Sequence, residues 1–494
     1  MSTYILSIDQ GTTSTRAMIF NEKGDTIGAH QIAFQQYFPH NGWVEHDPNE
    51  IWQTTVACCQ YAIQNAKLTA SNIATIGIST QRETTIIWDK KTGEPIYRAI
   101  VWQDRRTAAE CAALLQDKKN QKMVSEKTGL SIDPYFSATK IAWILDHVDH
   151  ARNRAEKGEL AFGTIDTFLL WKFTNGNSFF TDATNASRTL LFNIHTQEWD
   201  DALLSLFRIP KKILSSVKDS NADFGSTSLF GHAISITGIA GDQQAATIGQ
   251  ACFQPGMIKS TYGTGCFVVL NTGKQAIQSQ HRLLTTIAYK LNGETTYALE
   301  GSIFCAGASL QWLIKNLKCI ASADESEALA NAVSDTNGVH FIPAFTGLGA
   351  PYLDPHARAA ILGMTRDTQI AHIVRAALEA VCYQTMDLIR AIQEDFSAPL
   401  KILHVDGGMT KNNWLLQFLS DMLNLTVSRH TCIETSALGA ALLAGLGKGI
   451  YKNTDEISRI IRHEKSFSPT ISEAIRERYY TDWKKAISSI LTPQ

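Results

Sequence analysis

Residues 7–20 read SIDQGTTSTRAMIF, and residues 257–273 repeat the same order of residue types as MIKSTYGTGCFVVLNTG. Each stretch predicts a β-strand, a tight Gly/Thr-rich turn and a second β-strand. Such a turn exposes backbone N–H groups and hydroxyls and carries little side-chain bulk, which suits an anionic group. Two ordinary hairpins have the same appearance, because Gly/Thr turns are common. One copy in each half of the chain favours a nucleotide phosphate chain held from both sides.

The residues of these turns are the candidate phosphate contacts. The first turn offers hydroxyls and amides from three residues: Thr12, Thr13 and Ser14. Arg16 follows, where its charge is expected to meet the transferring phosphoryl group. Asp9 stands just before the turn, and a carboxylate there can hold a metal-bound water. In the second turn Thr264, between two glycines, presents an N–H and a hydroxyl.

Size and composition set the class of protein. At 494 residues the chain exceeds what one hydrophobic core usually serves, so we expect two domains, 1–247 and 248–494. A hydrophobic content of 44%, a charged content of 19% and a net charge of −2 describe a soluble globular protein without the basic face of a nucleic-acid binder. Nine scattered cysteines without a C-x-x-C predict free thiols in a reducing cytoplasm.

Two further patterns concern membranes and metals. The opening residues MSTYILSIDQ lack a secretory signal pattern, and the weakly polar stretch 437–447 is too short to cross a bilayer. We therefore expect a cytoplasmic protein without stable membrane insertion. The fourteen histidines show no metal-ligand spacing, so no structural zinc is expected.

Strands alternate with helices along the chain, which predicts an α/β architecture. The expected strands are Ile5–Ile8, Arg16–Phe20, Ile73–Ser79, Thr85–Trp88, Ile258–Leu270 (with its turn) and Ile402–Val405. The expected helices are Glu50–Lys67, Lys140–His147, His372–Glu394 and one carrying Leu415–Leu423. GIAGDQQA at 239–246 predicts a strand-to-helix turn. Apolar residues every four positions from Ile471 to Ile487 predict a packed amphipathic C-terminal helix.

The predicted nucleotide site has neither the Walker motif nor the glycine-rich dinucleotide-binding motif. No G-x-x-x-x-G-K-[ST] exists, and no G-x-G-x-x-G follows a strand. For the nucleoside, HVDGGMTKNN at 404–413 offers a strand end, Gly408 for close approach and Asn412 at a helix start. Gly307 and Gln311 are four apart and share a face if their segment is helical. A Gly-Gly turn is also ordinary after a strand, so each signal is weak alone.

DQGTTS, YGTG and DGG, in this order, resemble the two phosphate elements and the adenosine element of the actin, Hsp70 and sugar-kinase ATPase fold. YFSATKIAWILDH (135–147) and AAILGMTRDTQIAHIVRAALE (359–379) are similar to the two diagnostic segments of the FGGY carbohydrate kinases. The resemblance covers essentially the whole chain. It implies an α/β protein with two ribonuclease-H-like (actin-like ATPase) domains flanking a central catalytic cleft, and it implies ATP and Mg²⁺ as cofactors.

Within that family, GWVEHDP (42–48), STQRETTIIWD (79–89) and VWQDRR (101–106) resemble the branch that acts on glycerol. The resemblance implies contacts to the glycerol hydroxyls from five residues: Arg82, Glu83, Tyr135, Asp242 and Gln243. It implies that Trp102 and Phe267 flank the glycerol carbons. The local sequence alone fits two other interpretations equally well. Trp102 and Phe267 could be ordinary core aromatics, and Arg82 and Glu83 could form an ion pair on the surface.

Two carboxylates receive different roles. Asp242 lies in a Gly-Asp-Gln turn between a strand and a helix, and we expect it to accept the proton of the attacking hydroxyl. Asp9, beside the first phosphate turn, is expected to face magnesium through water. The predicted reaction is in-line transfer of the γ-phosphoryl of ATP to a terminal hydroxyl of glycerol, the first step of glycerol catabolism.

Two other functions share part of this sequence pattern. A pentulose kinase would share the nucleotide site and differ near Arg82, Trp102 and Tyr135. An actin- or Hsp70-like ATPase without an acceptor would need a further domain. About 70 residues follow the helix that carries Leu415–Leu423, which we expect to be too few for such a domain. Residues 228–237 (SLFGHAISIT) lack the basic residues with which some bacterial relatives bind a sugar bisphosphate. The resemblance also suggests a homodimer or homotetramer.

Overall fold

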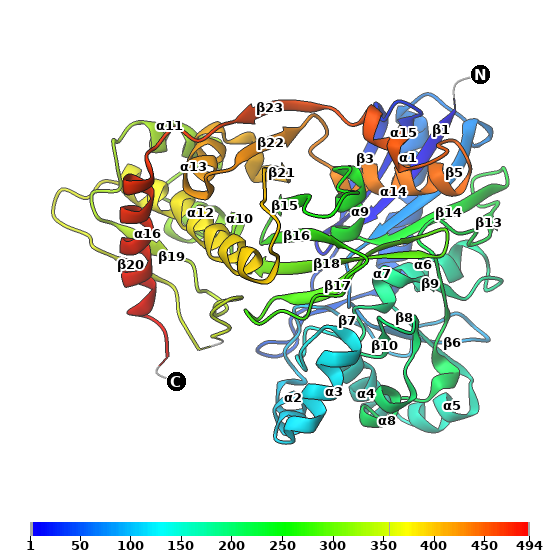
Figure 1. Cartoon of the computed structure of the whole chain (residues 1–494). Coiled ribbons are helices and arrows are strands. Elements are labelled where there is room, and N and C mark those ends of the chain that lie inside the picture. Colours follow the sequence, from blue (N-terminus) through cyan, green and yellow to red (C-terminus); the bar gives the residue numbers. More distant parts are fainter. Residues whose placement is uncertain (1–2, 355, 493–494) are drawn as a thin grey trace.

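The computed structural model describes residues 3–354 and 356–492, and its main elements are two mixed sheets (Figure 1). The first sheet contains, in spatial order, β13 (Ser226–Thr227), β14 (Ile234–Gly241), β5 (Ile73–Thr80), β1 (Tyr4–Gln10), β2 (Ser14–Asn21) and β3 (Thr26–Ala33). The second contains β17 (Leu284–Leu291), β18 (Glu294–Ile303), β16 (Cys266–Gly273), β15 (Ile258–Tyr262), β21 (Ile402–Asp406), β22 (Thr426–His430) and β23 (His463–Phe467). The predicted α/β class is confirmed.

The two Gly/Thr turns occupy equivalent places in the two sheets. β1 pairs antiparallel with β2 and parallel with β5, and β15 pairs antiparallel with β16 and parallel with β21. β5 and β14 are also parallel. The segments that follow these parallel strands therefore begin at the same edge of each sheet, where ligands bind in α/β proteins. They are the segments that carry Arg82, Asp242 and Gly407.

Helices cover the sheets and fill the space between them. In the first half they are α1 (Pro48–Asn65), α2 (Ala108–Leu115), α3 (Lys118–Thr128), α4 (Ser137–His147), α5 (Ala151–Lys157), α6 (Ile165–Phe173), α7 (Ala183–Ala186), α8 (Asp201–Leu206) and α9 (Asp242–Gly249). In the second half they are α10 (Gly307–Trp312), α11 (Glu325–Asn331), α12 (Ile370–Asp395), α13 (Asn413–Leu423), α14 (Thr435–Gly447), α15 (Thr454–Ile460) and α16 (Glu473–Ser488). The predicted elements agree with these bounds to within a few residues.

Short strand pairs complete the fold. They are β4 (Glu45–His46) with β7 (Ala99–Ile100), β6 (Ile86–Asp89) with β8 (Leu160–Gly163), β9 (Phe180–Asp182) with β12 (Ser216–Lys218), β10 (Phe192–Asn193) with β11 (Glu198–Trp199), and β19 (His340–Ile342) with β20 (Ala360–Leu362). The strand expected at Thr85–Trp88 is therefore β6, outside both large sheets. Figure 1 shows α2–α5 and α8 grouped below the first sheet.

Helix α14 belongs to the second half of the chain but packs on the first sheet. It contacts β1, β5, β14 and α9. The approach is so close that a Cβ on Gly77 of β5 would lie 2.0 Å from the carbonyl oxygen of Ala440, and one on Gly439 would lie 1.7 Å from that of Ala245. Only glycine fits at such distances. The domain boundary expected near residue 247 falls inside α9 and stays a prediction.

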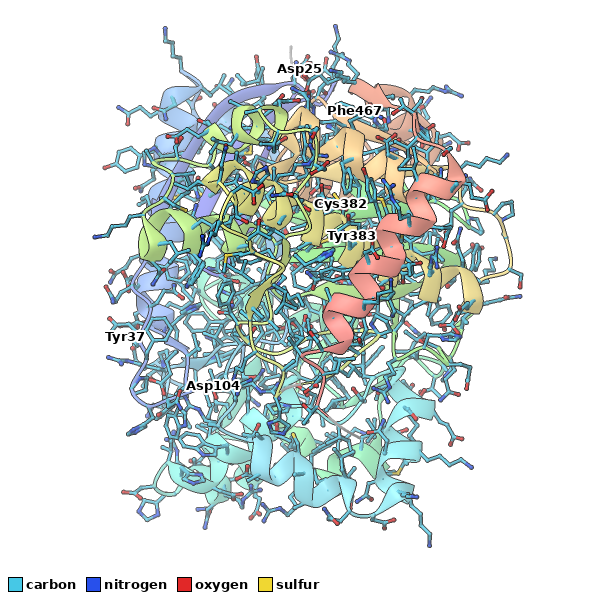
Figure 2. All side chains as sticks on the ribbon, turned by 90° about the vertical axis from the view of Figure 1, so that its left-hand side faces the viewer. Asp25, Tyr37, Asp104, Cys382, Tyr383 and Phe467 are labelled. Carbon is cyan, nitrogen blue, oxygen red and sulfur yellow. The ribbon has the colours of Figure 1, made fainter. Side chains whose placement is uncertain are left out.

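The buried face of the C-terminal helix agrees with the predicted row only in its second half. Trp483 and Ile487 are buried as predicted, whereas Ile471 precedes α16 and Ile475 is 38% exposed. The helix also buries Tyr480, one position after the Tyr479 of the predicted row. A strict spacing of four advances the side chain by roughly 40° per step, because a turn contains 3.6 residues, so the row leaves the buried face. Figure 2 shows α16 beside Cys382 and Tyr383 of α12, and the Tyr383 and Trp483 rings stack with centroids 5.3 Å apart.

Three histidines face one another across the edge of the second sheet. The ring centroids of His404 (β21) and His463 (β23) are 5.0 Å apart, and those of His430 (β22) and His463 are 5.9 Å apart. His404 Nδ1 and His430 Nε2 are buried without a hydrogen-bond partner. Burial, and to a smaller extent the neighbouring imidazoles, lower the pKa of both His404 and His430 to about 4. Both side chains are therefore neutral in the folded protein at pH 7.

This cluster predicts loss of stability in mild acid. Between pH 6.5 and 4 the unfolded chain binds more protons at these histidines than the folded one, so stability falls as the pH falls. We expect a loss of about 2 kcal/mol per buried histidine between pH 7 and pH 5. Denaturant unfolding at the two pH values measures it. His404→Gln should reduce the pH dependence, His232→Gln in an exposed loop should not, and equal dependence in His404→Gln and wild type contradicts the prediction.

Candidate active site

A cavity of about 440 Å³ lies on the second sheet, and five of the residues expected to bind the nucleotide line it. These are Thr264, Gly307, Gln311, Gly408 and Asn412. Gly307 and Gln311 both belong to α10, so the helical spacing expected for them is confirmed. Asn412 caps α13 by accepting a hydrogen bond from the N–H of Leu415. Turn, helix and strand end thus converge on one cavity.

The second Gly/Thr turn is fixed by the start of α10. The N–H groups of Ala306 and Ala308 both donate to the carbonyl of Thr264, at 2.9 and 3.0 Å. Gly307 N–H donates to the carbonyl of Gly263, and a Cβ on Gly307 would lie 2.6 Å from that oxygen. The Thr264 N–H and hydroxyl take no part in these contacts, so they are free for a ligand.

Sequence reasoning missed the rest of the cavity lining. Its apolar surface comes from Leu310, Leu378 and Met409. Its polar rim includes Ser326 and Glu327 of α11, which hold the start of α13. Ser326 Oγ accepts from Asn412 Nδ2 at 3.1 Å, and Glu327 accepts from the N–H of Asn413 at 3.1 Å. No local motif marks α11, and only its packing against α13 places it here.

The first Gly/Thr turn contacts the expected acceptor residues. The hydroxyl of Thr12 accepts a hydrogen bond from Trp102 Nε1 at 2.9 Å. Thr13 is exposed at the tip, and Ser14 Oγ accepts from Gln31 at 2.7 Å. The Arg16 guanidinium forms an ion pair with Glu434, so its contact with a phosphoryl group stays a prediction.

Aromatic rings from both halves of the chain surround Arg82. The Trp102 ring lies edge-on to Tyr135 and to Phe267, with centroids 5.6 and 6.2 Å away. The Arg82 guanidinium lies 5.7 Å from the centroid of Phe267, and its Nη2 is 3.4 Å from Tyr135 Oη. Glu83 adopts φ 60°, and its Oε1 is 3.8 Å from Arg82 Nε. This bend in the backbone lets the side chains of two consecutive residues converge.

Asp242 begins α9 directly after β14, as the strand-to-helix prediction requires. Its Oδ1 lies 3.4 Å from Arg82 Nε and accepts the N–H of Gln243 at 2.7 Å. Its side chain is 29% exposed, whereas Arg82 is buried. A ligand can therefore reach the carboxylate. The side-chain oxygen of Gln243 accepts a hydrogen bond from the buried Lys259 Nζ at 2.5 Å, so that oxygen is already engaged.

Asp9 is a carboxylate without a cationic partner at hydrogen-bond range. Across residues 3–354 and 356–492 it forms no salt bridge, and no three His, Cys, Asp or Glu side chains are grouped as a metal cluster. The pKa of Asp9 is raised to about 7, mainly by burial; Arg16 opposes this rise, and Glu434 and Asp242 add to it. A lone carboxylate beside a phosphate turn fits Mg²⁺, which keeps several waters and uses one or two carboxylates plus phosphate oxygens.

Two family models match this chain. The N-terminal domain of the FGGY family of carbohydrate kinases matches residues 4–249, and the C-terminal domain matches residues 258–447. The chain belongs to the FGGY family of carbohydrate kinases. Its curated relatives include the glycerol kinase of Alcanivorax borkumensis, 58% identical over 99% of this chain and 98% of the relative. The glycerol kinase of Coxiella burnetii is 57% identical over 100% of this chain and 99% of the relative.

Solved structures of FGGY kinases have the same fold. Plasmodium falciparum glycerol kinase with ADP superposes with a TM-score of 0.92 at 38% identity, over 100% of this chain and 99% of that one. A ligand-bound xylulose kinase from Lactobacillus acidophilus superposes with a TM-score of 0.88 at 20% identity, over 99% and 98% of the two chains, and shows the fold alone. Among the described residues of this FGGY chain, no helix has the length and hydropathy to span a membrane.

Sequence reasoning missed two charged residues that lie beside Arg82. Arg188 follows α7, and Glu300 lies in β18; their exposed fractions are 0% and 1%. Burial raises the pKa of Glu300, but Arg188 and Arg82 outweigh it and lower the pKa to about 2. Glu300 is thus ionised inside the protein. Neither residue belongs to a motif, and only the fold brings them to Arg82.

Proposed function

We propose that this chain phosphorylates glycerol at a terminal hydroxyl with ATP, yielding sn-glycerol 3-phosphate and ADP, with Asp242 as the general base. The observation that carries the proposal is the group formed by Arg82, Tyr135, Trp102 and Phe267 beside the carboxylate of Asp242. It has the size and mixed polarity that a three-carbon polyol needs. High identity to glycerol kinases over the full length supports the same substrate.

The residues around Arg82 and Asp242 offer partners for both the hydroxyls and the carbons of glycerol. Arg82 and Tyr135 donate hydrogen bonds to hydroxyl oxygens, and Glu83 and Asp242 accept from hydroxyl hydrogens. The amide of Gln243 adds a donor. The faces of Trp102 and Phe267 cover the carbons, and the Trp102 bond to Thr12 ties this wall to the first phosphate turn. The acceptor is thereby oriented relative to the phosphate chain, which is the main source of rate in such reactions.

Phosphoryl transfer then needs little covalent help from the protein. The transition state is loose, and positioning and charge stabilisation supply most of the catalysis. The two Gly/Thr turns hold the phosphates through Thr12, Thr13, Ser14 and Thr264. Asp242 accepts the proton of the attacking hydroxyl, a contribution of ~10²–10⁴-fold. The adenosine lies against Gly307, Gln311, Gly408 and Asn412 in the 440 Å³ cavity.

Asp9 would hold Mg²⁺ through water. When bound, the ion neutralises charge on the phosphate oxygens. Asp9 itself needs to be ionised and correctly oriented for this, and its place at the end of β1, opposite Arg16 in the hairpin register, fixes the orientation. The partners of the protein are therefore glycerol, ATP and ADP. A homodimer or homotetramer in the cytoplasm, without bisphosphate regulation, completes the proposal.

A comparison of acceptors tests the function. ADP formation is measured with Mg·ATP and glycerol, with xylulose, and with no acceptor. Glycerol-dependent ADP formation, with glycerol 3-phosphate as the product, is expected. ADP formation with xylulose alone identifies a pentulose kinase, and acceptor-independent ADP formation identifies an actin- or Hsp70-like ATPase. Either result rejects the proposal.

The adenosine cavity gives a selective prediction. A Cβ at Gly408 would meet no atom within 4 Å, so the fold accepts a side chain there. Gly408→Val fills part of the cavity, and we expect the KM for ATP to rise about tenfold, since misfit of one or two methyl groups costs ~1–3 kcal/mol. The KM for glycerol should be unchanged. Gly408→Ala should lie between wild type and Gly408→Val, and a wild-type KM for ATP in Gly408→Val contradicts the placement of the nucleoside.

A further inference from the structure

Two buried arginines and two buried glutamates form one ion network behind the acceptor residues. Arg82 Nη1 and Nη2 donate to the two carboxylate oxygens of Glu300, at 2.5 and 3.0 Å. Arg188 Nη2 donates to Glu300 at 2.9 Å, and Arg188 Nε donates to Glu83 at 2.6 Å. Two positive and two negative charges therefore balance in a site without solvent, where each charge needs a partner.

The network joins the two halves of the chain. Arg82, Glu83 and Arg188 come from the first half, whereas Glu300 comes from β18 of the second sheet. β18 is held by β16 on one side and β17 on the other, and Glu300 pairs in register with Val269 and Leu284. Glu300 is thus a fixed point on a rigid strand. Arg82, in contrast, lies in the loop after β5.

Glu300 decides where the rest of the Arg82 guanidinium points. With both Nη groups directed at Glu300, the Nε edge forms a long ion pair with Asp242 at 3.4 Å, and Nη2 also donates to Tyr135 at 3.4 Å. These two long contacts leave room for an oxygen atom of a ligand to take a better hydrogen bond. Without Glu300, Arg82 would be free to turn toward Asp242 and shorten this ion pair.

We propose that Glu300 and Arg188 are positioning residues for the acceptor alcohol: Glu300 holds Arg82 from across the two halves of the chain, and Arg188 holds Glu83. The proposal rests on the function proposed above and deepens it. The acceptor site is complete only when β18 is packed against the Arg82 loop. The Arg82–Glu300 fork holds Arg82 at 3.4 Å from Asp242 and keeps it from closing further on that carboxylate, and the Arg188–Glu83 bond leaves the second oxygen of Glu83 for a hydroxyl.

Glu300→Gln tests the proposal. It keeps the shape and one acceptor oxygen and removes the charge. We expect the KM for glycerol to rise about tenfold or more and kcat to fall, because charge-assisted hydrogen bonds are the strong ones and a freed Arg82 moves closer to Asp242. The KM for ATP should stay within about twofold of the wild-type value. Glycerol binding followed by calorimetry should weaken in parallel, which is a readout independent of turnover.

A matched variant separates positioning from general stability. Asp387 is another buried carboxylate of the second half, and it accepts hydrogen bonds from Tyr480, Trp483 and Tyr352 at 2.5, 3.0 and 2.8 Å. Asp387→Asn should lower the unfolding temperature and leave both KM values unchanged. An unchanged KM for glycerol in Glu300→Gln, or an equal rise in Asp387→Asn, overturns the proposal.

Arg188→Lys tests the proposal if Glu300→Gln does not fold. Lysine keeps the charge but loses the planar fork that reaches Glu83 and Glu300 together. A raised KM for glycerol with an unchanged KM for ATP supports the proposal, and wild-type values overturn it. Failure of the proposed function is recognised separately, because the wild-type protein would then show no glycerol-dependent ADP formation, whatever the variants do.

Discussion

Asp242→Asn should lower kcat by at least ~10²-fold while glycerol binding stays within a few-fold of wild type. The asparagine keeps the size of the side chain and the oxygen that accepts the N–H of Gln243. It cannot accept a proton from the attacking hydroxyl. The loss therefore falls on the chemical step, because the proton acceptor matters only as the transition state forms.

Steady-state kinetics and calorimetric glycerol binding check this prediction. A surface variant serves as the control: Asp201 begins α8, pairs with Lys211 and is exposed, so Asp201→Asn should have wild-type kinetics. Turnover of Asp242→Asn near the wild-type value removes Asp242 from the role of base. Loss of glycerol binding with unchanged kcat at saturation would assign it to binding alone.

Asp9→Asn should raise the magnesium concentration needed for half-maximal activity by ~10–100-fold, the usual cost of losing a group that orients a metal ligand. The substitution is isosteric and removes the charge that would attract the ion. Calorimetric binding of ATP with and without Mg²⁺ gives a second readout, in which the benefit of magnesium should shrink. The KM for glycerol should change little.

The control for Asp9 lies at the opposite end of the first sheet. Asp25, labelled in Figure 2, is in the turn between β2 and β3 and pairs with Arg462 at 3.2 Å. Asp25→Asn should show wild-type magnesium dependence. If Asp9→Asn responds to magnesium as the wild type does, the assignment of Asp9 is wrong.

Local sequence predicted the places of the turns well, because the backbone shape of a turn depends on a few consecutive residues. Gly263–Gly265, Gly407–Gly408 and the Gly307/Gln311 pair are recognisable from a few consecutive residues. The residues expected to bind glycerol were predicted mainly from the resemblance to the family. Arg82, Tyr135 and Phe267 are far apart in the chain, and only the fold brings them together. Whether each contacts its expected ligand stays a prediction.

Glu300 shows what the sequence cannot reveal. It is the second of two glutamates in the strand ETTYALEGSI, and the sequence of this strand does not distinguish it from the exposed Glu294. Its burial depends on two arginines 112 and 218 positions away. Arg16, beside the first turn, likewise has a partner that its local sequence does not reveal, because Glu434 from the other half of the chain pairs with its guanidinium. Its contact with a phosphoryl group stays a prediction.

The seating of α14 has a consequence for how this chain is built. The first sheet receives one of its covering layers only after some 430 residues have been synthesised, because Ala437–Gly447 supplies the apolar surface against Ile5, Met18 and Phe20. A nascent polypeptide that ends near residue 250 would expose the apolar surface of the first sheet that α14 otherwise covers. Completion of the apolar core on this side of the first sheet is thereby deferred until translation is almost finished.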